Sequence, residues 1–486
     1  MKQCNFCFHR DKLRDACGVV GIFSKKQTFV AQDMFHTLLS LQHRGQESAG
    51  ICTFAGNTLK NTRGMGLVTE VFPKRKLQGI FGNRAIGHVR YSTAGESTLE
   101  NAQPLLFDSP HIKFAMALNG TLTNFLQLRK QLTNEGHIFV GSGDTEILAH
   151  ILASKFLETN DYLEAIKASM KVLDGSYSVT LLNDKGELFG FKDPTGFKPL
   201  CYGESSDGKY IIASESVAVD AIRGRLIKNF APGEIIKIDA DGNLSDEMGP
   251  KADRHGFCVF EFVYFARPDA RFDGICVYDV REQLGRNLAR NETAAIDESN
   301  AVVVPIPDSG RTAGSGYSIE SGIPLREGLM KNRYVHRTFI MPSQTLRDYA
   351  VFLKLNPVIT QIAGKEVILV DDSIVRGTTC RQIVKLVRDA GAKKVHLRIS
   401  CPPLISACYM GIDFPNKAAL IAAKLNVPEI CQYMGADTLN FQSLEGLVQA
   451  TQMPRSELCL ACLTGDYPLK TPPDFELLTQ KLDIVK

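Results

Sequence analysis

The stretch EVILVDDSIVRGTT, residues 366–379, decides the fold of the second half of the chain. The apolar residues 367–370 predict a fully buried strand, which ends at two adjacent carboxylates, Asp371 and Asp372. A loop of small and hydroxyl residues follows, and a helix is expected from about Thr379. Strands that are apolar throughout belong to parallel sheets covered by helices. The stretch therefore predicts a parallel α/β domain.

The same stretch carries the elements of a phosphate site. Adjacent strand residues point to opposite sides, so Asp371 and Asp372 can serve different groups, such as a ribose diol and Mg²⁺. The loop from Ser373 to Thr379 supplies backbone N–H groups, two threonine hydroxyls and a helix N-terminus. An ordinary turn with two capping acids is the alternative for an isolated Asp pair. The complete nonamer DDSIVRGTT favours a functional loop.

The first half of the chain has a different pattern of expected secondary structure, in which short β-rich runs alternate with amphipathic helices. Helices are expected over 30–42 and 145–156. A stretch rich in glycine, proline and charge predicts a domain boundary near residue 250, before the strand–loop–helix pattern that begins near 298. The runs expected as strands are GVVGIF, AGICTF, AIGHVRYS, KFAMAL, YSVTLLN, YIIASES and EIIKIDA.

Composition limits the function classes. The 486 residues are 44% hydrophobic, which fills two or three cores, and the formal net charge is only +3. We therefore expect no nucleic-acid or membrane surface and a small charged substrate. No apolar run reaches a membrane span, and residues 1–16 carry charges where a signal peptide needs an apolar core, so a cytoplasmic location is expected. In that compartment the 13 cysteines are expected as thiols, metal ligands or catalysts.

Three stretches of the second half resemble one enzyme family. VILVDDSIVRGTT resembles the phosphoribosyl-pyrophosphate (PRPP) signature of type I phosphoribosyltransferases, in the form found in glutamine PRPP amidotransferases. VVVPIPDSG resembles the family's pyrophosphate and magnesium loop, and GLMKNRYVHRTFIMPSQTLR resembles the mobile loop that closes over PRPP. The resemblance implies one Mg²⁺ per subunit at Ser309, Asp371 and Asp372. It implies PRPP binding by Asp371, Asp372, Ser373, Arg376, Gly377, Thr378, Thr379, Lys331, Arg333 and Tyr334.

The stretch DACGVVGIF, residues 15–23, places Cys17 at the start of a predicted strand. A lone cysteine there is ordinarily a small buried thiol. An α-amino group titrates near about 8 and can serve an adjacent thiol as a base only when no peptide bond occupies it. In the family a cysteine at the mature chain start attacks the glutamine amide. The resemblance thus implies a nucleophilic Cys17 and removal of a propeptide, residues 1–16.

Further motifs match the family's glutamine site. Arg90 in GHVRYSTAG resembles the clamp for the glutamine α-carboxylate, and Asp144 in SGDTE matches the acid that holds the α-amino group. Asn119 and Gly120 in LNGTLTN match an oxyanion hole. Taken singly, these residues also suit a surface strand, a helix N-cap and a hairpin turn. LQHRGQESAG, residues 41–50, matches a family hallmark to which the sequence assigns no catalytic role.

Four cysteines form a candidate metal centre. Cys459 and Cys462 have C-x-x-C spacing, which can place two thiolates on one centre, and their softness permits zinc as well as iron. Cys258 and Cys408 match the remaining ligands in the iron–sulfur branch of the family. The resemblance alone implies one [4Fe-4S] cluster per subunit.

Together these observations predict two domains and a tail. We expect an αββα sandwich of the N-terminal-nucleophile (Ntn) hydrolase type, acting as a class II glutaminase, over 17–250. A type I phosphoribosyltransferase domain with a Rossmann-like parallel sheet is expected over 251–445, and a tail with cluster cysteines over 446–486. The fold class is thus mixed α/β and α+β.

The resemblance implies one reaction at two sites. Glutamine is hydrolysed, and ammonia is channelled to C1 of PRPP to give 5-phosphoribosylamine, glutamate and diphosphate, the first step of de novo purine (IMP) biosynthesis. This would be a pentosyltransferase with amidotransferase activity, and the family suggests homotetramers inhibited by purine nucleotides. The alternatives are an ammonia-dependent phosphoribosyltransferase paralogue and a non-catalytic iron–sulfur regulator.

Overall fold

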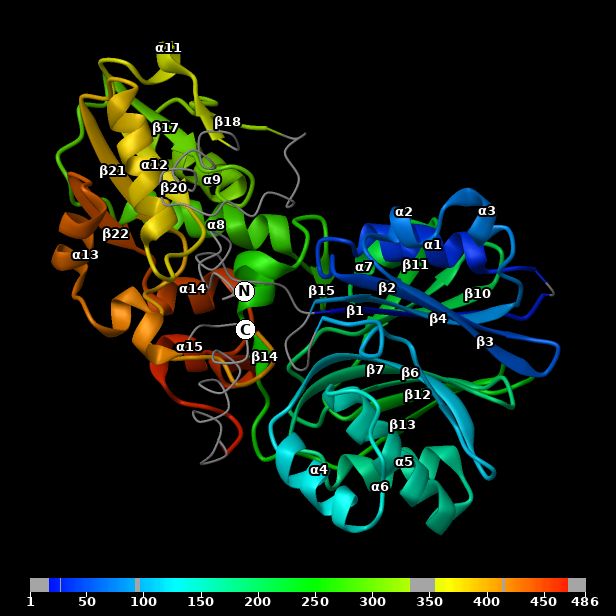
Figure 1. The fold of residues 1–486 in the computed structure, drawn as a ribbon. Helices are drawn as coiled ribbons and strands as arrows, with labels where there is room; N and C mark the ends of the chain where they lie inside the picture. The colour runs from blue at the N-terminus through cyan, green and yellow to red at the C-terminus, as the bar shows by residue number, and fades with distance from the viewer. Residues whose placement is uncertain (1–16, 27, 92–96, 333–354, 413–415, 471–486) are drawn as a thin grey trace, which may run out of the picture.

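The computed structural model describes residues 17–26, 28–91, 97–332, 355–412 and 416–470 (Figure 1). The predicted propeptide, Arg333 and Tyr334 lie outside these residues. Two bodies are visible, one built on two antiparallel sheets and one built on a parallel sheet (Figure 1).

Two stacked sheets form the core of the first body. The seven-stranded sheet has the order β11-β9-β10-β1-β4-β2-β3, and the six-stranded sheet has the order β13-β12-β8-β7-β6-β5. Neighbouring strands within them pair antiparallel. The strands are β1 (Gly18–Ser24), β2 (Ser48–Ala55), β3 (Thr58–Met65), β4 (Arg84–Arg90), β5 (Leu105–Asp108), β6 (Lys113–Leu122), β7 (Gly175–Asn183), β8 (Leu188–Lys192), β9 (Cys201–Ser205), β10 (Lys209–Ala213), β11 (Gly224–Asn229), β12 (Glu234–Ile238) and β13 (Leu244–Met248).

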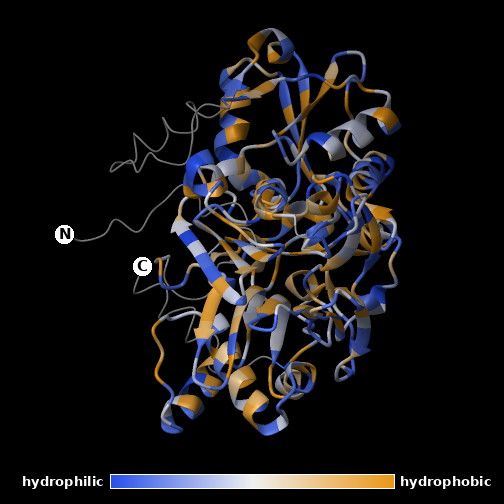
Figure 2. Cartoon of the chain, turned by 90° about the vertical axis from the view of Figure 1, so that its right-hand side faces the viewer, coloured by the Kyte–Doolittle hydropathy of each residue, from blue (hydrophilic) through white to orange (hydrophobic). Residues whose placement is uncertain are grey.

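Apolar side chains alternate between the two faces of the strands, so that one set packs between the sheets and the other packs against the covering helices. Phe23 of β1 and Leu182 of β7 share the cluster between the sheets, while Ile22 of β1 faces the helices on the outside. Figure 2 shows hydrophobic and hydrophilic residues mixed along the covering helices, as amphipathic helices require. The helices are α1 (Ala31–Ser40), α2 (Val68–Val71), α3 (Lys74–Leu77) and α7 (Ser216–Asp220) on one face, and α4 (Phe125–Asn134), α5 (Asp144–Thr159) and α6 (Tyr162–Met170) on the other. This arrangement confirms the predicted αββα sandwich.

The predicted elements of this body are present, with small shifts at their ends. The helices expected over 30–42 and 145–156 are α1 and α5. The run YIIASES is a strand only as far as Ala213, because the chain turns at Glu215 and α7 begins at Ser216. All seven expected strands occur.

The second body contains the predicted parallel sheet, with the order β17-β20-β21-β22. Its strands are β17 (Ala301–Pro305), β20 (Glu366–Asp371), β21 (Lys394–Ile399) and β22 (Thr438–Phe441). Separate apolar clusters cover its two faces, so the strands are buried on both sides. The helices around it are α8 (Val277–Arg290), α9 (Arg311–Ser321), α11 (Ile359–Ile362), α12 (Thr378–Asp389), α13 (Val427–Met434) and α14 (Leu444–Thr451).

Short elements complete this half of the chain. A π-helix, η2 (Glu261–Phe265), and a final helix, α15 (Ala461–Thr464), lie near the junction of the two bodies. The two-stranded pairs are β14 (Phe257–Cys258) with β23 (Leu458–Cys459), β15 (Arg271–Phe272) with β16 (Ile275–Cys276), and β18 (Leu329–Lys331) with β19 (Leu355–Pro357). Short 3-10 turns lie at Lys417–Ala419, Ile421–Ala423 and Arg455–Glu457.

Helices α8 and α9 approach each other so closely that glycine is required at the contact. A Cβ atom on Gly285 would lie 1.8 Å from the carbonyl oxygen of Ala313, and one on Gly316 would lie 1.9 Å from that of Glu282. Both obstacles are backbone atoms, which no rotamer change can move. The position of α9, which follows the loop at Ser309, therefore depends on these two glycines.

We expect Gly285→Ala to destabilise the protein by about 1–3 kcal/mol, because the added methyl group forces the two helices apart. The change is measured as a lower midpoint of urea unfolding. Gly79→Ala is the matched control, since a Cβ there meets its nearest atom at 3.4 Å. Equal midpoints for the two variants would contradict the required close contact.

Candidate active sites

One pocket of about 340 Å³ gathers four of the five residues predicted for the glutamine site. Cys17, Arg90, Gly120 and Asp144 all line it. Cys17 directly precedes β1, Arg90 ends the neighbouring strand β4, Gly120 lies in β6, and Asp144 begins α5. The stacking of the two sheets thus brings together side chains from distant parts of the sequence.

The Cys17 thiol is buried and held in one orientation. Its Sγ donates a hydrogen bond to the carbonyl oxygen of Tyr91 at 3.2 Å. Burial raises the pKa of the thiol, and the charge of Asp144 raises it further, while Arg90 opposes the change. A thiol with a raised pKa is neutral at physiological pH and needs a base to become a nucleophile.

Asn119 and Gly120 lie inside β6, paired with β7, rather than at a hairpin turn. The Asn119 side chain is fully buried, and neither its Nδ2 nor its Oδ1 has a hydrogen-bond partner within the described residues. Gly120 has φ +150°, and a Cβ atom there would lie 1.9 Å from the carbonyl oxygen of Ser176. An unpaired buried amide is costly, so this donor is suited to a ligand that completes it.

Asp144 is buried at the first turn of α5, where Gly143 rather than Asp144 holds the N-cap position. Its Oδ2 accepts a hydrogen bond from the backbone N–H of Leu122 at 3.1 Å. Burial raises the pKa of Asp144 to about 6, although this bond and the charge of Arg90 favour the ionised form. The carboxylate is therefore charged at neutral pH and able to bind an ammonium group.

Two residues that sequence reasoning missed hold the strand that carries Asn119. Gln103 Oε1 accepts a hydrogen bond from Leu118 N at 2.7 Å, and His88 Nε2 lies 3.1 Å from the Leu118 carbonyl oxygen. Burial lowers the pKa of His88 to about 3, so the neutral ring donates this bond. The available signal for His88 was a polar residue within the otherwise apolar strand AIGHV. Gln103 had no comparable signal.

The predicted PRPP residues meet at the carboxyl ends of β17 and β20. Asp371 and Asp372 are both buried, and Ser309 Oγ donates a hydrogen bond to Asp371 Oδ1 at 3.4 Å. Ser373 Oγ donates to Asp372 Oδ2 at 2.5 Å. Lys331 Nζ lies 2.7 Å from Asp308 Oδ2, beside Ser309.

A helix N-terminus faces this same edge of the sheet. Helix α12 begins at Thr378, directly after Gly377, whose φ of +83° allows the sharp turn. Thr378 and Thr379 thus occupy the first turn, one residue earlier than predicted. Arg376 lies in the intervening loop. This is the geometry of a phosphate site at the end of a parallel strand.

The four predicted cluster cysteines come together from three parts of the chain. Cys258 of β14 lies opposite Cys459 of β23 in a parallel pair, and Cys462 follows in α15. Cys408 joins them from the loop after β21. Cys258, Cys408 and Cys459 each act electrostatically on the Cys462 thiol and raise its pKa. Burial raises the pKa of all four thiols.

The described residues contain no group of three or more His, Cys, Asp or Glu side chains arranged to hold a single metal ion. The charge of buried Lys198 acts on Cys258, Cys408 and Cys459 and opposes the rise in their pKa.

Among the residues that the structure describes, no helix is both long and apolar enough to cross a bilayer.

Comparison with known proteins assigns each half of the chain to a protein domain family. Residues 88–221 match the glutamine amidotransferase domain family, and residues 278–407 match the phosphoribosyl transferase domain family. The chain therefore joins a glutamine-dependent amidotransferase to a phosphoribosyltransferase.

Relatives match over nearly the whole chain. An amidophosphoribosyltransferase of Archaeoglobus fulgidus is 48% identical over 94% of this chain and 98% of its own, and one of Bacillus subtilis is 43% identical over 95% and 96%. The structure of glutamine PRPP amidotransferase from B. subtilis, complexed with ADP and GMP, matches with a TM-score of 0.86 and 42% identity, covering 94% of this chain and 98% of that one. The chain belongs to the amidophosphoribosyltransferase family.

If Asp144 is the ligand of the glutamine α-ammonium group, the fall of kcat/KM for glutamine hydrolysis with decreasing pH is expected to steepen below about 6, by about a further tenfold per pH unit beyond the effect of the Cys17 α-amino group. The sign follows from the raised pKa, because protonation removes the charge that binds the ammonium group. A pH–rate profile from 4.5 to 8 measures it. The steepening should be absent in Asp144→Asn, and a wild-type profile that does not steepen down to pH 5 would contradict the assignment.

Proposed function

We propose that glutamine is hydrolysed in the Cys17 pocket and that the ammonia attacks C1 of PRPP bound at the edge formed by β17 and β20. The products are 5-phosphoribosylamine, glutamate and diphosphate, as in the first step of purine biosynthesis. The convergence of Cys17, Arg90, Gly120 and Asp144 on one pocket carries the proposal. The glutaminase domain spans 17–250, the phosphoribosyltransferase domain 251–445 and the tail 446–486, after removal of the propeptide 1–16.

The glutamine half begins with deprotonation of Cys17. Once residues 1–16 are removed, its own α-amino group takes the thiol proton, and Sγ attacks the side-chain amide carbon. Asn119 Nδ2 and the Gly120 N–H stabilise the oxyanion, while Arg90 and Asp144 hold the α-carboxylate and α-ammonium groups. The α-ammonium group of Cys17 gives the proton to the amide nitrogen, the C–N bond breaks and ammonia leaves; water then hydrolyses the glutamyl thioester to glutamate and frees the Cys17 thiol.

In the second half, the chain orients PRPP for attack by ammonia. Asp371 and Asp372 bind the ribose hydroxyls, and the loop residues Ser373, Arg376, Gly377, Thr378 and Thr379 bind the 5-phosphate at the start of α12. Lys331 and Arg333 supply positive charge to the departing pyrophosphate, and the Tyr334 hydroxyl donates a hydrogen bond to it; Arg333 and Tyr334 lie outside the described residues. Ammonia must travel between the sites without contact with water, which would protonate it.

The oxygen donors at this edge fit Mg²⁺. Ser309 and Asp371 present their oxygens 3.4 Å apart, and hard oxygen ligands are those that Mg²⁺ prefers. Ser309, Asp371 and Asp372 would hold one ion per subunit. Bound there, Mg²⁺ neutralises the charge of pyrophosphate.

The four cysteine thiols fit a [4Fe-4S] cluster, one per subunit. In such a cluster each thiolate binds a different iron, so the ligands lie farther apart than those of a single ion. The support is that Cys258, Cys408 and Cys459 all act electrostatically on Cys462, and that the positive charge of Lys198 acts on the first three. When bound, the cluster ties the C-terminal segment to the junction of the two bodies.

We also propose a cytoplasmic homotetramer regulated by purine nucleotides. The support for regulation is that a relative of 42% identity was solved as a complex with ADP and GMP. The two alternatives, an ammonia-dependent paralogue and a non-catalytic iron–sulfur regulator, have no need of a complete glutamine pocket.

Anaerobic intact mass and pyrophosphate release test this function together. We expect a chain that begins at Cys17 and releases pyrophosphate only when both glutamine and PRPP are present. Cys17→Ala should abolish the glutamine-dependent reaction while ammonium chloride at high pH still supports release. Retention of residues 1–16 with activity from ammonia alone would instead favour the paralogue.

We expect anaerobically purified protein to contain about four iron atoms per chain and Cys459→Ser to lose most of them. Cys431→Ser, in α13, is the matched control and should retain its iron. Metal analysis and visible absorbance measure the outcome. A wild-type chain that carries zinc or no metal under these conditions would exclude the cluster.

A further inference from the structure

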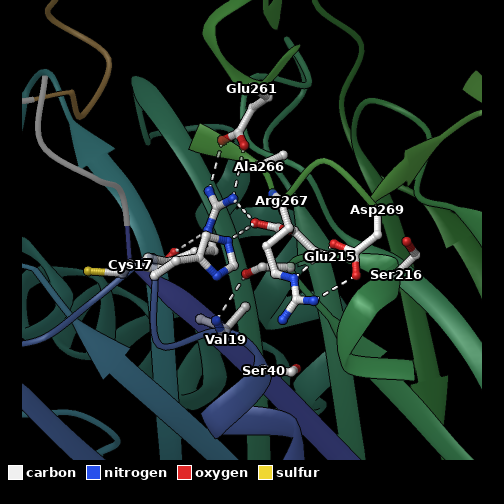
Figure 3. Close-up of polar contacts among 12 residues, drawn as sticks. Cys17, Val19, Ser40, Glu215, Ser216, Glu261, Ala266, Arg267 and Asp269 are labelled. Carbon is white, nitrogen blue, oxygen red and sulfur yellow. Dashed lines mark hydrogen bonds and ion pairs between the residues drawn. The ribbon is translucent and has the colours of Figure 1, made fainter. Parts of the chain in front are cut away.

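The motif LQHRGQESAG contains Arg44, whose side chain is 1% exposed and reaches the main chain of Cys17. Its Nε donates a hydrogen bond to the Cys17 carbonyl oxygen at 3.0 Å. Its Nη1 donates to Glu215 Oε1 at 2.6 Å, and its two Nη groups donate to both carboxylate oxygens of Glu261 at 2.9 and 2.8 Å. Figure 3 shows Cys17, Glu215 and Glu261 among the residues of this network of polar contacts.

The group is charged and fully removed from water. Burial acts to lower the pKa of Arg44, but the two carboxylates overcome it and raise the pKa above its ordinary value. Burial likewise opposes ionisation of Glu215, yet the charges of His43 and Arg44 lower its pKa to about 2. His43 Nε2 lies 2.7 Å from Glu215 Oε1, and the backbone N–H of Arg267 binds Glu215 Oε2 at 3.1 Å. Every charge in the cluster therefore has a defined partner.

The members of this cluster come from both bodies of the molecule. Arg44 follows α1, and Glu215 lies between β10 and α7, so both belong to the sandwich that carries Cys17. Glu261 is the first residue of η2, beyond the last strand of that sandwich. The bidentate contact to Arg44 thus crosses the junction.

We propose that Arg44 is a positioning residue for the nucleophile, and that Glu261 fixes the Arg44 guanidinium so that it holds the Cys17 carbonyl. A cysteine at a mature chain start has no preceding peptide to restrain it. The carbonyl of its single peptide bond is therefore an effective point at which to fix the Sγ and the α-amino group. This inference rests on the proposed glutaminase activity and assigns the role that the hallmark motif lacked.

Helix η2 is also held by a second arginine, Arg281. Arg281 of α8 donates from Nε to the Phe262 carbonyl oxygen at 2.7 Å and from Nη2 to that of Ala266 at 2.8 Å. The negative charge of Asp372, in the candidate PRPP loop, acts on Arg281. Hydrogen bonds thus connect the Cys17 carbonyl, through Arg44 and η2, to Arg281 of α8.

Glu261→Gln and Arg44→Lys in the full-length mature protein test the proposal. Gln keeps the shape of Glu261 and leaves Glu215 to neutralise Arg44, which favours folding. The matched control is Glu292→Gln, which removes the carboxylate from another bidentate pair, partly buried, with Arg398 in the second body. The measurements are kcat and KM for glutamine hydrolysis, and the rate at which iodoacetamide modifies Cys17, followed by peptide mass spectrometry.

We expect both variants to lower kcat for glutamine hydrolysis at least about tenfold, with KM changed less than about twofold, because a displaced nucleophile slows attack without altering the amino-acid contacts. The double variant should be no slower than the slower single variant, since both changes disrupt one unit. Values within twofold of wild type would overturn the proposal. Losses matched by Glu292→Gln would overturn it too, because they would reflect general destabilisation.

The alkylation rate separates this inference from the glutaminase assignment. If the wild-type chain hydrolyses no glutamine, the proposed function fails, while iodoacetamide still reports the environment of Cys17. A rate and pH dependence of modification changed in Glu261→Gln but not in Glu292→Gln would support positioning. Identical modification in all three proteins would overturn it.

Discussion

One buried cation, the guanidinium of Arg44, holds together the parts of this protein that must act in concert. Charges removed from water are stable only when each has a well-placed partner, and breaking one such pair costs far more than an exposed pair. Here the partners are a main-chain carbonyl, a carboxylate of the same body and a carboxylate of the other. The two bodies can therefore change their relative position only by disturbing the segment that begins at Cys17.

The two active sites follow the same construction although their folds differ. In each, buried strands end together at one edge, and polar side chains emerge where the apolar pattern stops. Arg90 follows six residues of β4, and Asp371 is the last residue of β20. A helix then begins at the site, α5 at Asp144 and α12 at Thr378. Packing of the buried strands behind each edge fixes the position of these side chains.

Much of this arrangement could be predicted from the sequence, because both folds rest on hydrophobic patterns that are local. The run at 367–370 and the strand GVVGIF are fully buried as expected. The motifs also predicted four residues that the structure places around one pocket, Cys17, Arg90, Gly120 and Asp144, although Asn119 does not line it. Polar contacts between residues far apart in the sequence could not be predicted. The hydrogen bonds of Gln103 to Leu118 and of Arg44 to Glu261 depend on strand register and side-chain rotamers, which neighbouring residues in the sequence do not determine. The positions of Arg333 and Tyr334 lie outside the described residues, so their predicted roles stay predictions.

The parallel pairing of Cys258 with Cys459 has a consequence for biosynthesis. During translation the sandwich can fold, and Arg44 can meet Glu215 and Glu261, while most of the second body is still unmade. The four cysteines Cys258, Cys408, Cys459 and Cys462 have no such opportunity, since two of them follow the last strand and helix of the second body, β22 and α14. Its assembly must therefore be among the last events of folding, and a ribosome that stalls before residue 459 leaves a chain whose glutaminase body is formed but whose thiols remain exposed and oxidisable.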